Sequence, residues 1–179
     1  MRRFLVLLAT LATLASCAGL STLPAAATPS YCGLGWGSQD KTSSHYAAAT
    51  VADVRAGRHE CFDRLVIDLS GPVAGYHAGY VGTVTQDGSG APVPLRGGAF
   101  LQIAVLAPAY DDAGNSTYTP SNRTELLSTN GYPTFRQVAF AGSFEGRTTF
   151  GLGTRARLPF RVSTLDGPAR VVVDVAHHW

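Results

Sequence analysis

Phe62-Asp63-Arg64-Leu65-Val66-Ile67-Asp68-Leu69 is the stretch that decides the fold. Its apolar side chains alternate with charged ones, so one face of an extended chain carries Leu65, Ile67 and Leu69. This period of two residues is typical of a strand with one buried face. The stretch therefore predicts a β-strand that covers a hydrophobic core.

A second stretch near the C-terminus repeats the same order of side chains. Arg170-Val171-Val172-Val173-Asp174-Val175 again places an arginine and an aspartate four residues apart, with valines between and around them. The two stretches lie about 100 residues apart in the chain. We expect them to belong to two sheets of similar construction.

Further stretches with strand character separate these two. Turn sequences such as 87–90, 96–98 and 166–168, rich in Gly and Asp, divide them at spacings typical of a sandwich. The fold class is therefore all-β: a single β-sandwich of two antiparallel sheets with about eight strands. The other expected strands are 50–55, 76–85, 99–107, 134–141, 148–152 and 159–165.

The N-terminus has the pattern of a signal peptide, assigned to residues 1–27. Arg2 and Arg3 precede an apolar segment that is shorter and more diluted than the ~20 residues of a spanning helix. Two cleavage sites compete. Cleavage before Cys17 in Leu14-Ala-Ser-Cys17 would leave a lipidated cysteine on the membrane, and cleavage after Ala25-Ala-Ala27 would release the protein. Residues 28–44 are then a tether and an ordered arm, and 45–179 form the sandwich.

Charge and cysteine content narrow the function classes. Without Arg2 and Arg3 the twelve remaining basic residues balance the twelve acidic ones, and no basic run favours nucleic acid or anionic lipid. Membrane contact is expected only through a lipid on Cys17. In an exported protein Cys32 and Cys61 form an even pair, so a disulfide is expected, with two buried free thiols as the alternative.

Several polar groups raise the question of a catalytic or metal site. His59, Glu60 and Asp63 precede the strongest strand, but neighbouring side chains of a strand diverge and the helical zinc spacing is missing. His177 and His178 are adjacent and diverge in the same way, so we expect a solvated end or a hydrogen bond to a carboxylate. We assign no catalytic residue, metal or cofactor.

The segment Gly142-Ser143-Phe144-Glu145-Gly146 also combines a serine with an acid. It lacks the Gly-x-Ser-x-Gly spacing of a nucleophile elbow. We expect Phe144 to pack inward and Glu145 to pair with an arginine at a turn between strands.

Arginines and tyrosines are the candidate ligand-binding groups. The Arg and Asp residues of the two strand stretches fit cross-strand ion pairs, while arginine forks also suit carboxylates. Tyrosines can stack on sugar rings. The loop from Tyr110 to Pro133 is the longest, and such loops are either binding surfaces or tolerated insertions. The candidate residues are Arg155, Arg157, Arg161, Tyr110 and Tyr118.

Several ordered motifs resemble the AMIN-like domain of exported bacterial proteins and lipoproteins. They are 32–38 (CGLGWGS), 59–68 (HECFDRLVID), 142–146 (GSFEG), 158–161 (LPFR) and 172–177 (VVDVAH). AMIN domains are β-sandwich modules that accompany N-acetylmuramoyl-L-alanine amidases and secretion components and direct them to the cell wall. The resemblance implies a non-catalytic role in association with peptidoglycan or an envelope protein.

No amidase domain follows Trp179 in this sequence, so we expect localisation of the chain itself or recruitment of a partner. Two alternatives remain at this point. A secreted or lipid-anchored hydrolase of wall polymers would need His59 or Glu145 in a concave pocket. An extracellular interaction or inhibitor protein would need a rigid and protruding loop over 110–133.

Overall fold

The computed structural model describes residues 31–179, and the expected signal peptide and Cys17 lie outside that range. No helix of the described part is long and apolar enough to cross a membrane. The described part has a three-residue 3-10 helix and eleven β-strands. These elements are η1 (Tyr31–Gly33), β1 (Lys41–Ser43), β2 (Thr50–Arg58), β3 (Phe62–Ser70), β4 (Tyr76–Val81), β5 (Val84–Thr85), β6 (Pro92–Val93), β7 (Ala99–Val105), β8 (Phe135–Phe144), β9 (Arg147–Thr154), β10 (Phe160–Asp166) and β11 (Ala169–Ala176).

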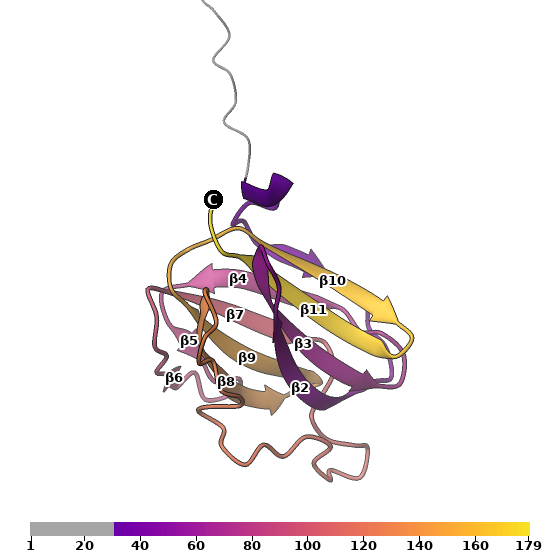
Figure 1. Ribbon diagram of the computed structural model, residues 1–179. Coiled ribbons are helices and arrows are strands. Elements are labelled where there is room, and N and C mark those ends of the chain that lie inside the picture. The colour runs from indigo at the N-terminus through magenta and orange to yellow at the C-terminus, as the bar shows by residue number, and fades with distance from the viewer. Residues whose placement is uncertain (1–30) are drawn as a thin grey trace, which may run out of the picture.

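Two antiparallel sheets stack to form a β-sandwich. One sheet has five strands in the order β1-β4-β7-β9-β8, and the other has four in the order β10-β11-β3-β2 (Figure 1). β5 and β6 form a separate short ribbon. The expected fold class, an all-β sandwich of two antiparallel sheets, is confirmed.

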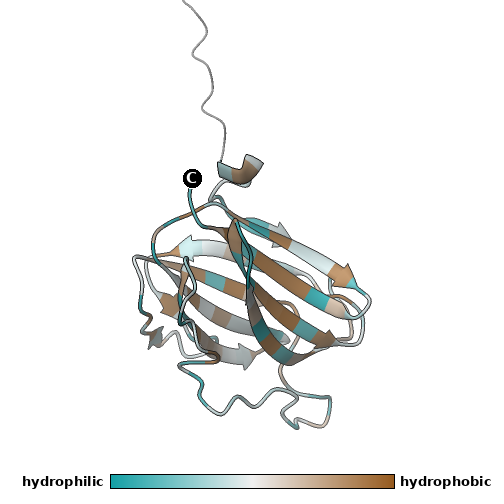
Figure 2. Cartoon of the chain, in the orientation of Figure 1, coloured by the Kyte–Doolittle hydropathy of each residue, from teal (hydrophilic) through white to brown (hydrophobic). Residues whose placement is uncertain are grey.

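Alternating side chains of both sheets fill the space between them. Leu65 and Val173 point inward from one sheet, Leu101 and Phe150 from the other, and all four are fully buried. Apolar residues follow the strands of both sheets, whereas the connecting loops are mostly polar (Figure 2). Burial of these side chains is the main source of stability, because each large one contributes about 1.5–3 kcal/mol.

The eight expected strands are all present, although 76–85 is interrupted and contains both β4 and β5. The expectation that the two similar strands lie in different sheets is wrong. β3 and β11 are antiparallel neighbours in one sheet, with Arg64 opposite Asp174 and Asp68 opposite Arg170. The period of two residues determines which face of a strand is buried, but it does not determine the partner strand.

The N-terminal arm is joined to the sandwich by a disulfide bond between Cys32 and Cys61, which confirms the expected pairing. Beyond the bond, the Trp36 indole packs edge-on against Phe62, with 5.5 Å between ring centroids. The Gly37 carbonyl accepts a hydrogen bond from the Phe160 amide at 2.9 Å. The arm then continues into β1, which is a strand of the five-stranded sheet.

The long loop between β7 and β8 packs along the edge of the sandwich. The Phe140 amide donates to the Arg123 carbonyl at 2.7 Å, and the Leu126 amide donates to the Val138 carbonyl at 2.8 Å. Through these hydrogen bonds the loop pairs with part of the free edge of β8. The loop is therefore attached to the sheet at 123–126. In Figure 1 it lies below the rest of the sandwich.

A tight turn at Glu145-Gly146 connects β8 and β9. Both residues have positive φ, +47° and +77°, as a two-residue hairpin turn of type I′ requires. The expectation that Phe144 packs inward is wrong, because its side chain is 48% exposed. Glu145 forms no ion pair with any residue of 31–179, so its expected pairing with an arginine is wrong as well.

Candidate functional site

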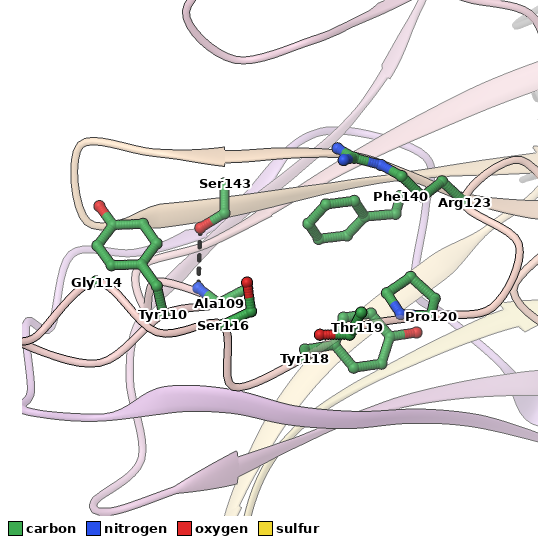
Figure 3. Close-up of a pocket in the computed structure, with 10 residues that line it drawn as sticks. All are labelled: Ala109, Tyr110, Gly114, Ser116, Tyr118, Thr119, Pro120, Arg123, Phe140 and Ser143. Carbon is green, nitrogen blue, oxygen red and sulfur yellow. Dashed lines mark hydrogen bonds between the residues drawn. The ribbon is translucent and has the colours of Figure 1, made fainter.

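A pocket of about 300 Å³ lies between the long loop and β8. The loop supplies one wall from 109–123, and β8 supplies the other with Phe140 and Ser143. Figure 3 shows Tyr110 at one end of the pocket and Arg123 at the other. Two of the five sequence candidates, Tyr110 and Tyr118, are thus brought to one site.

Aromatic rings form the apolar part of this pocket. Tyr118 and Phe140 lie 5.8 Å apart between centroids, and both contact Phe150 on β9, at 6.3 and 5.8 Å. Phe150 is fully buried in the core. Because the two pocket rings rest on a core residue, we expect them to hold their positions without a ligand.

The loop also places a cation against these rings. The Arg123 guanidinium carbon lies 4.7 Å from the centroid of the Phe140 ring. No carboxylate among residues 31–179 forms an ion pair with Arg123, whereas nearby Glu125 pairs with Arg96 at 2.8 Å. A guanidinium that is oriented by a ring and lacks an acidic partner can donate hydrogen bonds to the carboxylate of a ligand.

Tyr118 contributes a hydroxyl that stays protonated. Burial, together with the negative charge of Asp53, raises the pKa of Tyr118 to about 12. The preceding residue fixes this part of the loop, because the Thr117 hydroxyl donates to the Val51 carbonyl at 2.8 Å. Near neutral pH the Tyr118 hydroxyl is therefore a hydrogen-bond donor.

Tyr110 separates this pocket from a second, acidic one. Its hydroxyl accepts a hydrogen bond from the Gly146 amide at 3.2 Å. The second pocket, of about 520 Å³, is lined by Tyr110 together with Asp111, Asp112 and Glu145. Hydrogen bonds from Asn115 lower the pKa of Asp111, so this carboxylate stays ionised. Tyr110 lines both pockets. The first pocket contains the cation Arg123, whereas the second is lined by carboxylates.

The three candidate arginines do not line the pocket. Arg155 donates to the His177 carbonyl, and Arg157 donates to the Ser38 carbonyl at 3.1 Å. Arg161 donates to Asp174 at 2.9 Å and lies 4.5 Å over the Trp36 ring. Each of them therefore connects parts of the fold.

The outer face of the four-stranded sheet carries the expected cross-strand ion pairs. Arg64 and Arg161 both bind Asp174, which is fully buried, at 2.6 and 2.9 Å. The hydrogen bond to Asp174 raises the pKa of Arg64. Arg55 pairs with Asp68 at 2.7 Å in the same way. Asp68 and Asp174 are thus both held in cross-strand ion pairs, whereas Arg170 donates to the Pro168 carbonyl.

The residues considered for catalysis have structural contacts too. His59 stacks on Phe62 at 4.5 Å. Asp63 is fully buried and accepts hydrogen bonds from the Thr134 and Phe135 amides at 2.7 and 3.0 Å. His177 Nε2 lies 3.1 Å from Asp63, which confirms the expected contact with a carboxylate. In the part of the chain from 31 onward, no group of three or more His, Cys, Asp or Glu is placed to hold a metal ion.

Ser143 is also held in place within the fold. Its hydroxyl accepts from the Ala109 amide at 2.8 Å, shown as a dashed line in Figure 3, and donates to the Arg147 carbonyl at 3.1 Å. These contacts join the start of the long loop to the β8–β9 hairpin. Ser143 thus acts as a connector at the base of the pocket.

Comparison with known protein families identifies the family of the chain. The family model of the AMIN-like domain matches residues 49–177, from the beginning of β2 to the end of the sandwich. The chain belongs to the AMIN-like domain family. No curated protein and no solved structure matches it. AMIN-like domains are binding and targeting modules, and the AMIN family is associated with peptidoglycan.

Among the residues that line the pocket of this AMIN-like domain, sequence reasoning did not single out Arg123 and Phe140, which place a cation on an aromatic ring. Phe140 belongs to an expected strand and Arg123 is the one arginine between Tyr110 and Pro133. The lone cation in a polar loop was a usable signal for Arg123. The contact between Arg123 and Phe140 arises from the docking of the loop on β8, which no periodic pattern encodes.

Proposed function

We propose that this AMIN-like domain is a non-catalytic, exported cell-envelope module that binds peptidoglycan. The observation that carries the proposal is the family match over 49–177, which covers nearly the whole sandwich. The Cys32–Cys61 bond agrees with an extracytoplasmic location, where disulfides persist.

The geometry supports binding in the loop pocket. The pocket has the size of small-ligand sites, and its aromatic, hydroxyl and guanidinium groups suit a wall fragment. Sugar rings have apolar C–H faces that pack on aromatic side chains, and stem peptides carry carboxylates that arginine binds. Tyr110, Tyr118 and Arg123 are the residues proposed to contact the ligand. Arg155, Arg157 and Arg161 keep structural roles in this proposal.

Co-sedimentation with purified, insoluble peptidoglycan tests the proposed function. We expect the chain beginning at residue 28 to be retained, and Tyr118→Ala to be retained less because it removes an aromatic wall of the pocket. Arg170→Ala is the matched control, since among residues 31–179 the Arg170 side chain bonds only to the nearby Pro168 carbonyl. Retention no greater than that of an unrelated β-sandwich would contradict the proposal.

The same assay separates binding from the alternatives. A wall hydrolase would release soluble muropeptides from the pellet, whereas a binding module leaves the polymer intact. A module that recognises an envelope protein would sediment with crude walls and lose that retention after the walls are stripped of protein.

We further propose export by the N-terminal signal, either with a lipid on Cys17 or with release after Ala27. The intact mass of the protein from its native envelope distinguishes the two. A diacylated chain beginning at Cys17 and an unmodified chain beginning at Thr28 differ by far more than the error of the measurement. A mass that includes Met1 would contradict both.

A further inference from the structure

The charge distribution around the loop pocket selects one kind of ligand. Arg123 lies at one end of the pocket without an acidic partner among the described residues. Beyond Tyr110, at the opposite end, Asp112 and Glu145 line the neighbouring pocket. A bound carboxylate is therefore attracted to the Arg123 end and repelled from the Tyr110 end.

The wall next to Arg123 is suited to the uncharged part of such a ligand. Phe140 contacts both the guanidinium and the Tyr118 ring, so the cation and two aromatic faces are adjacent. The protonated Tyr118 hydroxyl and the Thr119 side chain lie within the same lining. A space of about 300 Å³ fits a sugar or a dipeptide and is too small for a folded partner.

Arg123 is also better placed for binding than the other arginines considered. Arg161 and Arg64 share the carboxylate of Asp174. Arg155 donates to a backbone carbonyl near the C-terminus, and Arg157 donates to one in the N-terminal arm. Those guanidinium groups would have to give up a protein partner in order to bind a ligand. Arg123 has no such partner among residues 31–179, and its stacking on Phe140 reduces the entropy lost on binding.

We propose that this pocket is a muramyl-peptide subsite in which Arg123 binds a stem-peptide carboxylate while Tyr118 and Phe140 contact the adjoining sugar or peptide. This assignment rests on the proposed function and specifies which part of peptidoglycan the domain recognises. The ligand chemistry is a carboxylate next to a segment with an apolar face. A neutral glycan without a stem peptide lacks the group that Arg123 binds.

Titration of the domain with muramyl dipeptide, followed by amide NMR shifts, tests the assignment. We expect saturable shifts at residues of 109–123 and at the Phe140 and Ser143 amides. Because a hydrogen bond to a charged group is worth about tenfold to a hundredfold in affinity, the carboxamide form of the same probe is expected to bind at least about tenfold more weakly. Chitobiose, which has no carboxylate, is expected to bind as weakly as the carboxamide.

Substitutions of Arg123 provide a second test of the assignment. Arg123→Ala is expected to weaken muramyl dipeptide binding by about tenfold or more, and Arg123→Lys by less, because the charge remains without the planar fork. Arg170→Ala is expected to bind within about twofold of the wild type. Thermal melting of each variant shows whether the fold is retained, and Phe140→Leu tests the same site without changing the charge.

The outcomes separate this inference from the proposed function. Equal affinity of the acid and the carboxamide, or of wild type and Arg123→Ala, overturns the subsite assignment, and so does an absence of binding by the wild type. If the wild type still sediments with peptidoglycan in those cases, the wall-binding function stands and its site lies elsewhere. If it does not sediment, the proposed function itself fails.

Discussion

At the residue scale, Asp174 shows how one buried carboxylate organises a sheet face. It lies on β11 between Arg64 on β3 and Arg161 on β10, and both guanidinium groups bind it. Burial of a charge is costly unless it is paired and hydrogen-bonded, so the three side chains depend on one another. Trp36 of the arm covers Arg161 from the outside.

We predict that Asp174→Asn lowers the free energy of unfolding by about 2–3 kcal/mol, because two arginines lose their charged partner. Arg161→Ala should cost less than about 1 kcal/mol, since its side chain is 45% exposed and Arg64 still neutralises Asp174. Urea denaturation measures both. Asp68→Asn, at the partly exposed pair with Arg55, is the matched control, and an equal loss there would contradict the special role of Asp174.

A second prediction at this scale concerns Tyr118 and alkaline pH. Because its pKa is raised from about 10 to about 12 in the folded chain, the folded state favours the neutral phenol. The associated stability is complete below pH of about 10 and is lost as the pH rises through about 12. Tyr118→Phe should lose less stability than the wild type over this range. Tyr76 and Tyr80, whose pKa values are also raised by burial, are common to both proteins and cancel in the comparison.

At the element scale, the β8–β9 hairpin contains a strained residue. Glu145 has φ of +47°, a conformation that side chains with a Cβ avoid and that asparagine tolerates best. Asn-Gly is the preferred pair for a type I′ turn, and the sequence here has Glu-Gly.

We therefore predict that Glu145→Asn raises the free energy of unfolding by about 0.5–1 kcal/mol. Glu145→Gln removes the same charge without the tolerance for positive φ, so it should give no such gain. Chemical denaturation of the two variants side by side provides the measurement. A gain shared equally by both would point to removal of the charge, since Glu145 lines a pocket with two aspartates.

The elements also show where sequence reasoning succeeds. The strands were predictable because burial of one sheet face forces a period of two residues, as in 62–69. The pairing of β3 with β11 was not, because the same alternation fits any neighbour. β6 has two residues, Pro92 and Val93, which is too short for any periodic signal. The pocket depends on a loop whose position is set by tertiary contacts, so only its aromatic and polar content was predictable.

At the scale of the whole molecule, the fold extends further than the family match. The match begins at residue 49, whereas the arm contributes β1 to one sheet and packs Trp36 against the other. The arm thus spans both layers of the sandwich. The disulfide fixes its beginning, 29 residues before Cys61.

We predict that the double variant Cys32→Ser, Cys61→Ser unfolds with a free energy about 3–4 kcal/mol lower, because the closed loop restricts the unfolded chain. Reduction of the wild type should produce a similar loss in urea denaturation. Reduction of the double variant is the control and should change nothing. An unchanged denaturation midpoint in the reduced wild type would show that packing of the arm alone is sufficient.

The two ends of the described chain lie together on one side of the sandwich. The Tyr31 and His178 rings touch, at 4.8 Å, on the side of the sandwich opposite the long loop (Figure 1). Whatever is attached through either end therefore leaves the loop facing away from the point of attachment. If the chain is tethered to a membrane surface through its N-terminal end, the loop pocket lies on the side of the sandwich away from the tether.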